Sequence, residues 1–282
     1  RLLGYEKGVN PVALQLGGSN PAELAQCAKW GEEAGFDEIN LNCGCPSPRV
    51  QSGDFGVVLM LSPQKVADCL KAMQDSVSVP VTVKHRIGVD DQTSYGFVRD
   101  FVGTVHEAGT RVFIVHARAA WLKGLSPKEN RDIPPLDREL AARLKADFPD
   151  SIFVVNGGIK TLSECQTELN RFDGVMLGRE AYNNPWLLTE VDHALYGDPE
   201  STLSRDEVVE QMADYVDLVQ EREPLAARTA VNHLMGLALG LPGGARHWRR
   251  LLTDPALWKT KKAGEIVRLA WKEVKPEAGL ED

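Results

Sequence analysis

Short apolar runs alternate with helix-like stretches along the first two thirds of the chain. The runs are rich in Val and Ile and each ends in Gly or a polar residue: Val12–Leu16, Glu38–Asn42, Val79–Arg86, Val112–Arg118, Ile152–Asn156 and Gly174–Gly178. The helix-like stretches are Pro21–Ala34, Pro63–Ser76, Tyr95–Ala108, Asp137–Ala146 and Leu162–Leu169. Near-continuous apolar strands followed by helices are typical of buried parallel strands. The pattern predicts an α/β fold with six βα units.

After about residue 200 the pattern changes. Strand-like runs stop, and four helical segments follow: Arg205–Glu221, Ala226–Gly240, Ala245–Leu252 and Trp258–Val274. Gly197-Asp198-Pro199 separates these segments from the preceding part, because Gly and Pro interrupt regular structure. We therefore expect an α/β domain over residues 1–199 and an all-α helical domain over residues 200–282.

Six βα units are two fewer than a closed (β/α)₈ barrel contains. Two folds remain open, a doubly wound open sheet and a barrel whose first units are missing from the front of the chain. Polar residues cluster at the carboxyl ends of the strands, the face where the active sites of barrels lie, and the chain starts at Arg1 without an initiator Met. We expect a (β/α)₈ TIM barrel that lacks its N-terminal βα units.

Composition indicates the class of protein and the compartment in which it works. Hydrophobic residues make up 43% and charged residues 26% of the 282 residues, as in ordinary globular proteins. Five cysteines, an odd number without framework spacing, indicate a reducing cytoplasm. No apolar run approaches the ~18 residues of a membrane span. Cys43-Gly44-Cys45 lacks a second ligand pair, so we expect no bound metal.

Charge is unevenly distributed along the chain. The formal net charge is −8, which by itself argues against a nucleic-acid partner. Residues 245–275, however, carry nine Lys or Arg and three Asp or Glu. A basic segment on an acidic body indicates one surface that meets a polyanion. The alternative is a solvated pair of amphipathic helices.

Polar residues near the ends of the first two predicted strands form a candidate site. Gln15 interrupts an apolar strand, and its carboxamide suits the edge of a planar heterocycle unless the backbone satisfies it in the core. Asn42 could hold a base edge by paired hydrogen bonds. Cys45 begins a loop, and its thiol, largely protonated at neutral pH, could act as a general acid or as a nucleophile. For Cys43 we expect a small buried side chain.

The next two strands end in basic residues. Lys84 shares a strand face with Arg86, because side chains alternate, and an inward lysine requires negative charge nearby. The electron-rich edge of a flavin would supply that charge. His85 faces the other way, which predicts a structural role. In the following strand, His116 and Arg118 share a face and either could contact a flavin or its phosphate.

The last two predicted strands end in glycines. Asn156-Gly157-Gly158 and Leu177-Gly178-Arg179 each precede a helical pattern. Consecutive glycines expose backbone N–H groups that can bind phosphate, and barrels often bind phosphate between their last two loops. Arg179 could add a bidentate clamp. The sequence therefore predicts a phosphate site formed by these two loops.

With these motifs in order, the chain resembles the dihydrouridine synthase family. Asn40–Met60, with Asn-Leu-Asn-Cys-Gly-Cys-Pro-Ser-Pro-Arg-Val, matches its cysteine-loop signature, and His116–Pro135 resembles the A class of bacterial enzymes. The resemblance covers nearly the whole chain. It implies an FMN-binding barrel with a C-terminal helical domain that reduces uridine in the tRNA D-loop with NADPH, at positions 20/20a. The family's N-terminal flavin-binding strand and the strand after it are absent here.

The resemblance also implies roles for single residues. Cys45 matches the proton donor and Asn42 a uridine contact, and Arg86 could offset negative charge on the base. The positions that match FMN contacts are Gln15, Lys84, His116, Asn156, Gly157, Gly158, Gly178 and Arg179. The positions that match tRNA contacts of the A class are Lys128, Arg131, Arg246 and Arg249. We expect a monomer.

Two other functions remain open from the sequence. An FMN reductase of the dihydroorotate or dihydropyrimidine dehydrogenase type would explain the phosphate site and Lys84, but not the basic helical segment. A non-catalytic RNA-binding module would explain the basic segment, but not an inward Lys84 or the Asn42–Cys45 turn. The combination favours a flavin-dependent reductase of uridine in tRNA.

Overall fold

A computed structural model describes residues 3–4, 8–242 and 244–274. The chain divides into two compact units. Unit 1 comprises residues 1–159 and 164–176, and unit 2 comprises residues 160–163 and 177–282. The outer ends of the two predicted domains, at residues 1–2, 5–7 and 275–282, lie outside the described residues. The predicted domain boundary between residues 199 and 200 stays a prediction.

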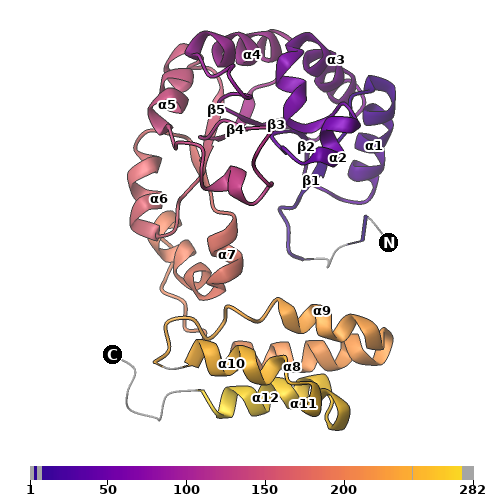
Figure 1. The fold of residues 1–282 in the computed structure, drawn as a ribbon, viewed down its shortest axis with the longest axis vertical. Helices are drawn as coiled ribbons and strands as arrows, with labels where there is room; N and C mark the ends of the chain where they lie inside the picture. Colours follow the sequence, from indigo (N-terminus) through magenta and orange to yellow (C-terminus); the bar gives the residue numbers. More distant parts are fainter. Residues whose placement is uncertain (1–2, 5–7, 243, 275–282) are drawn as a thin grey trace. The chain divides into compact units, whose positions relative to one another are not determined.

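Unit 1 contains a six-stranded parallel sheet in which each strand pairs with the next one along the chain (Figure 1). The strands are β1 (Ala13–Leu16), β2 (Glu38–Cys43), β3 (Val81–Arg86), β4 (Val112–His116), β5 (Ile152–Asn156) and β6 (Gly174–Met176). The connecting helices are α1 (Pro21–Glu33), α3 (Pro63–Gln74), α4 (Tyr95–Glu107), α5 (Arg138–Asp147) and α6 (Leu162–Leu169). The predicted α/β fold with parallel strands is confirmed, and closure into a barrel stays a prediction.

Two loops of unit 1 contain short helical segments that the sequence patterns did not indicate. The loop after β2 contains α2 (Pro48–Ser52) and the 3₁₀ segment η1 (Gly56–Leu61). The loop after β4 contains the 3₁₀ segment η2 (Glu129–Arg131). Both loops begin at the carboxyl ends of their strands, next to the predicted site.

The sheet has an apolar face and a polar face. On one face, β2 to β5 place side chains with 0% exposure, among them Ile39, Leu41, Val83, Phe113, Val115, Phe153 and Val155. The alternate positions carry polar side chains, including Gln15, Asn40, Asn42, Thr82, Lys84, Arg86, His116 and Asn156. The register sets Asn42 beside Lys84, Arg86 beside His116, and His116 beside Asn156. Parallel register therefore gathers the polar side chains of five strands on one face.

Local capping determines where the connecting helices begin. The side chain of Asn20 accepts hydrogen bonds from the N–H groups of Ala22 (3.0 Å) and Glu23 (3.3 Å) at the start of α1. Ser94 and Asp137 cap α4 and α5 in the same way. Each cap satisfies backbone donors that a helix start leaves unpaired, which stabilises the helix by about 1 kcal/mol.

The described part of unit 2 is helical. Its elements are α7 (Arg179–Asn183), η3 (Pro185–Glu190), η4 (Asp192–Tyr196), α8 (Arg205–Arg222), η5 (Pro224–Ala226), α9 (Ala227–Asn232), α10 (Gly244–Leu252), α11 (Pro255–Thr260) and α12 (Ala263–Lys272). Trp248 is fully buried, packs edge-on against Trp271 at 5.9 Å between ring centroids, and donates from Nε1 to the Leu234 carbonyl at 2.8 Å. Two indoles thus fix the position of α10 against α12.

Four predicted element boundaries were wrong. The helix predicted over residues 226–240 ends at Asn232, and Gly236 then packs so tightly that a Cβ would lie 2.2 Å from the Asn183 carbonyl oxygen. The helix predicted over residues 258–274 is two helices, because Lys261 between them is extended (φ −130°, ψ 155°). The strands predicted to end at Arg118 and Gly178 end at His116 and Met176. In the two mispredicted helices, a close contact with a distant residue or a break in the backbone outweighed the local sequence pattern.

Helices α8 and α12 touch at Gly264. Its N–H donates to Asp217 Oδ1 at 2.7 Å, and a Cβ at this position would lie 2.5 Å from the Ala213 carbonyl oxygen. The Ala213 oxygen belongs to the backbone, so it cannot move aside as the end of a flexible side chain can. Glycine at residue 264 is therefore a requirement of the helix contact.

We predict that Gly264→Ala lowers the free energy of unfolding of unit 2 by about 1–3 kcal/mol, the usual effect of overpacking. Urea denaturation followed by tryptophan fluorescence measures it. The control is Gly103→Ala in α4, where a Cβ would lie 3.7 Å from the Phe148 ring. That change should stabilise unit 1 by about 0.5–1 kcal/mol, because alanine favours helix. Wild-type stability of Gly264→Ala would contradict the close contact.

Candidate functional site

The environments of the five cysteines single out Cys45. All five are free thiols. Cys43 is fully buried, as predicted, and burial raises the pKa of its thiol. Cys69 and Cys165 are also buried, and burial raises the pKa of Cys69 to about 11. Cys45 and Cys27 are partly exposed, but Cys27 lies on helix α1. Cys45 is therefore the partly exposed thiol that follows a strand of the sheet.

The side chain of Asn42 forms the turn that carries Cys45. Asn42 Oδ1 accepts hydrogen bonds from the N–H groups of Gly44 and Cys45, each at 3.0 Å. Asn42 Nδ2 donates to Gln15 Oε1 at 2.7 Å. Since the oxygen already accepts two bonds, Asn42 has one amide N–H left for a ligand. The contact between Asn42 and a base stays a prediction, and one amide N–H of Asn42 would make it.

The carbonyl of Cys45 is fixed as well. It accepts a hydrogen bond from Val57 N–H at 3.0 Å. The neighbouring Gly56 has φ +72°, and a Cβ there would lie 2.8 Å from the Cys45 oxygen. Only glycine combines this left-handed conformation with such an approach. The backbone of Cys45 is thus held at its N–H by Asn42 and at its carbonyl by η1.

Arg86 joins three segments of the chain. The side chain is 3% exposed, and Nε donates to the Gly44 carbonyl at 2.8 Å. Nη1 donates to the carbonyls of Ala119 (3.0 Å) and Asn130 (2.9 Å). Burial lowers the pKa of Arg86 to about 10. The structure therefore shows Arg86 as a connection between loops, and its predicted action on substrate stays a prediction.

Lys84 lies on the polar face without a carboxylate partner among the described residues. Its Nζ donates to Asn156 Oδ1 at 3.0 Å, and Asn156 Nδ2 donates to the Met176 carbonyl at 2.8 Å. Burial, and secondly the charge of Arg86, lower the pKa of Lys84 to about 8. A desolvated cation whose partner among the described residues is an amide oxygen favours an incoming anionic or electron-rich group. His85 lies on the opposite face, as predicted, and is fully buried, with its ring tilted by 52° against that of Phe101.

Gly157 and Gly158, which follow β5, have backbone conformations that favour glycine. Gly157 has φ +123° and Gly158 has φ +70°. A Cβ on Gly157 would lie 3.0 Å from the His116 ring, so His116 packs against this turn. A Cβ on Gly158 would lie 3.6 Å from Arg138 Nη2 and 4.0 Å from Arg118 Nη2. Two guanidinium groups therefore border a backbone turn of the type that binds phosphate.

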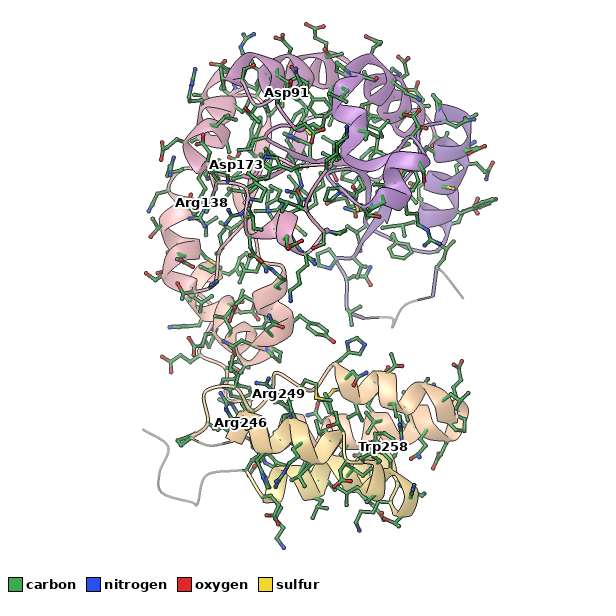
Figure 2. All side chains as sticks on the ribbon, viewed as in Figure 1. Asp91, Arg138, Asp173, Arg246, Arg249 and Trp258 are labelled. Atoms are coloured by element: carbon green, nitrogen blue, oxygen red, sulfur yellow. The ribbon has the colours of Figure 1, made fainter. Side chains whose placement is uncertain are left out.

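Arg138 was not found by the sequence reasoning. It donates from Nη2 to the Gly157 carbonyl at 2.8 Å and pairs through Nη1 with Glu168 Oε1 at 3.0 Å. Figure 2 labels Arg138 at the side of the sheet where β5 ends. Gly178 and Arg179 belong to unit 2 and are exposed at the start of the short helix α7. Their predicted sharing of one phosphate with Gly158 stays a prediction.

Asn130 organises the loop that carries Lys128 and Arg131. It is 0% exposed, its Oδ1 accepts from Trp121 N–H at 2.8 Å, and its Nδ2 donates to the Trp121 carbonyl at 2.9 Å. Lys128 and Arg131 lie at the two sides of Asn130 and are exposed. A buried polar residue thus presents two cations on a fixed loop, and sequence alone gave no sign of its burial.

The basic residues of unit 2 differ in whether a carboxylate pairs with them. On α12, Arg268 pairs with Glu210 at 2.7 Å and also with Asp214 and Asp217. On α10, Arg246 and Arg249 (Figure 2) are exposed, as is Arg250, and no ion pair to a carboxylate is seen for them in the described residues. Exposed lysines without such an ion pair also follow α10, at Lys259, Lys261, Lys262 and Lys272. Helix α10 therefore carries three of the unneutralised cations of this part of unit 2, and the four lysines lie after it.

Two kinds of structure are absent from the described residues. No helix there is both long and apolar enough to cross a bilayer. No group of three or more His, Cys, Asp and Glu there is arranged to hold a metal ion.

Comparison with known proteins assigns the chain to a family. The family described as Dihydrouridine synthase (Dus) matches residues 3–272. A tRNA-dihydrouridine(20/20a) synthase of Pseudomonas putida is 56% identical over 253 residues, which cover 90% of this chain and 75% of that protein. Proteins of the same name from Escherichia coli O6:H1 (54% over 259 residues, 90% and 76%) and Shewanella oneidensis (50% over 276 residues, 98% and 81%) are also similar.

Among solved structures, a phosphoenolpyruvate phosphomutase from Streptomyces platensis subsp. rosaceus matches 70% of this chain and 72% of its own with a TM-score of 0.42 and 16% identity. A likeness at that level carries no information on chemistry. The family match extends over nearly all of the described residues, and relatives at half identity or more cover most of the chain. The chain belongs to the dihydrouridine synthase family.

Proposed function

We propose that this protein reduces uridine to 5,6-dihydrouridine in the D-loop of tRNA, with FMN as cofactor, NADPH as reductant and Cys45 as proton donor. The observation that carries the proposal is the fixed, partly exposed position of Cys45 at the carboxyl end of β2, beside the polar face of the sheet. The relatives are named for positions 20 and 20a of tRNA, and we propose the same positions here. The sheet is proposed to be part of a TIM barrel, with a helical tRNA-binding domain after residue 199.

The residues of the polar face fit FMN. Lys84 is a desolvated cation with no carboxylate partner among the described residues, and an electron-rich ring edge would relieve its burial. Gln15 has one amide N–H and part of an acceptor oxygen left for the ring. Gly157 and Gly158, bordered by Arg138, His116 and Arg118, form a turn suited to phosphate. We propose Asn156, Gly178 and Arg179 as further contacts.

The proposed chemistry divides between cofactor and chain. When bound, FMN would supply hydride chemistry toward C6 of the uracil. Cys45 gives its proton to C5 of the ring, and either Arg86 or Lys84 offsets the negative charge that develops toward the C4 carbonyl. Asn42 donates its remaining N–H to a carbonyl oxygen of the base. The uracil must leave its stack for this reaction, and D-loop bases are already partly exposed.

The tRNA is proposed to bind mainly through its phosphates. Arg246 and Arg249 on α10 are exposed cations, and Lys128 and Arg131 are held on the loop that Asn130 organises. Such contacts give affinity that falls as salt concentration rises. We propose that the protein acts as a monomer on one tRNA.

Replacement of Cys45 tests the proton donor. Cys45→Ala should lower the rate of dihydrouridine formation by about 100-fold or more, the range of a lost general acid. NADPH-dependent flavin reduction should stay within about twofold of wild type, since that step does not need the thiol. Mass analysis of tRNA measures the product, and Cys27→Ala is the matched control. A fully active Cys45→Ala protein, or faster turnover of free uridine than of tRNA, would contradict the proposal.

Replacement of Lys84 separates stability from function. Burial lowers the pKa of Lys84 in the folded protein to about 8, below the ordinary value of 10.5, so the unfolded chain binds more protons between these pH values. Burial of charged Lys84 therefore lowers the free energy of unfolding by its full amount below pH 8, and this effect disappears as pH rises toward 10.5. We predict that Lys84→Met stabilises the FMN-free protein at pH 7 by about 1–3 kcal/mol.

The same change should weaken FMN binding by about tenfold or more, because a charge-assisted contact is lost. Urea denaturation at pH 7 and pH 10, and quenching of flavin fluorescence, are the two measurements. Lys29→Met, at an exposed lysine of α1, is the control and should change neither. A destabilised Lys84→Met protein at pH 7 with wild-type FMN affinity would show that Lys84 is an ordinary structural residue.

Replacement of the α10 arginines tests the tRNA surface. Arg246→Ala and Arg249→Ala should each weaken tRNA binding and lower the slope of log K against log salt by about 0.7–0.9 per lost phosphate contact. Binding titrations at several salt concentrations measure the slope. Lys71→Ala in α3 is the control, because Lys71 pairs with Asp75 in unit 1. An unchanged slope would assign α10 to a solvated face.

A further inference from the structure

Five polar side chains of β1, β2 and β3 form one continuous chain of hydrogen bonds. Asn42 donates to Gln15 at 2.7 Å, and Gln15 Nε2 donates to Asn40 Oδ1 at 2.8 Å. Asn40 Nδ2 donates to Thr82 Oγ1 at 2.8 Å, and the Thr82 hydroxyl donates to Glu38 Oε1 at 2.5 Å. Each of the other four side chains thus donates its hydrogen bond in the direction of Glu38. The chain runs from the cysteine turn to a carboxylate at the start of β2.

The direction of the donors is fixed at both ends. At one end, the N–H groups of Gly44 and Cys45 both point at Asn42, so an oxygen must face them. At the other end, a carboxyl oxygen of Glu38 accepts the hydrogen bond of the Thr82 hydroxyl. Reversal of any carboxamide between these ends would set two donors or two acceptors against each other. The orientation of Gln15, Asn40 and Asn42 is therefore a property of the whole chain of bonds.

The position of the network argues that it has a role beyond folding. Asn40 is 3% exposed and Thr82 is 1% exposed, in strands whose other face is apolar. An unpaired buried polar group costs about 1–3 kcal/mol, so this arrangement is stable only when each partner is present. Apolar side chains at residues 40 and 82 would fill the sheet without that requirement. What the polar pair adds is a link between Glu38 and the carboxamides of the candidate site.

We infer that Glu38 is a positioning residue, which acts through Thr82 and Asn40 to fix the carboxamides of Gln15 and Asn42. In the fixed orientation, Asn42 presents one N–H donor and no free acceptor to the site. It therefore recognises a carbonyl oxygen of a pyrimidine and rejects an exocyclic amino group at the same place. This inference rests on the proposed function for the identity of the base, while the network itself does not.

The first test uses the FMN-free protein and does not depend on activity. Side-chain amide signals of Asn42 and Gln15 are recorded by ¹⁵N–¹H NMR and assigned with Asn42→Asp and Gln15→Glu. Thr82→Val removes the hydroxyl link at nearly constant volume, and Glu38→Ala removes the terminal acceptor. Both should shift the Asn42 amide signals and speed their exchange with water, whereas Glu33→Gln, at an exposed carboxylate of α1, should not. Unshifted Asn42 signals in both variants would overturn the inference.

The second test measures kcat/KM for uridine reduction in tRNA at saturating FMN. Glu38→Ala and Thr82→Val should each lower it by about tenfold, the effect of one misplaced hydrogen bond. The affinity for tRNA should stay unchanged, because phosphates dominate it. Glu38→Gln, which keeps an acceptor oxygen, should recover activity to within about threefold of wild type.

The double variant separates a linked network from two independent effects. If Glu38 acts through Thr82, the combined Glu38→Ala and Thr82→Val protein should be no worse than either single variant. Multiplied losses, or a matching loss of tRNA affinity, would show general structural damage and overturn the inference. A wild-type protein that forms no dihydrouridine would refute the proposed function instead, and the NMR test would still decide the network.

Discussion

Two backbone N–H groups, those of Gly44 and Cys45, share one side-chain oxygen of Asn42, and the candidate site depends on this small turn. It ends β2, reverses the chain toward η1, and presents the thiol of Cys45 while Cys43, two residues earlier, lies in the core. If the strand continued for two more residues, Cys45 would lie on the same buried face as Cys43, because side chains of a strand alternate. One amide group thus separates the buried Cys43 from the partly exposed Cys45.

The polar face of the sheet shows how the fold combines stability with chemistry. Parallel register gathers amides and cations from five strands, and nearly every one has a protein partner: Lys84 with Asn156, Gln15 with Asn40, Arg86 with three carbonyls. The remaining hydrogen-bonding capacity is small and directional. A face of this kind selects ligands by which donors and acceptors remain, rather than by its total polarity.

Much of this architecture followed from the sequence, because it depends on local pattern. The six strands, the five helices between them and the burial of Cys43 come from hydrophobic periodicity and composition. The break at Lys261 and the early end of α9 at Asn232 depend on single backbone conformations and on contacts with distant residues. The roles of Arg86 and Asn130 could not be predicted, because their partners are backbone carbonyls, which every residue has. Polar alternation at residues 38, 40 and 42 was visible, but its hydrogen-bond partners in β1 and β3 were not.

The buried guanidinium of Arg86 couples the movements of two loops. It donates to the Gly44 carbonyl in the loop after β2, and to the Ala119 and Asn130 carbonyls at two points of the loop after β4. Neither loop can detach alone without leaving part of the guanidinium unsatisfied. We therefore expect the two loops to open as one cooperative block, with a common opening free energy and similar protection of their amides from hydrogen exchange.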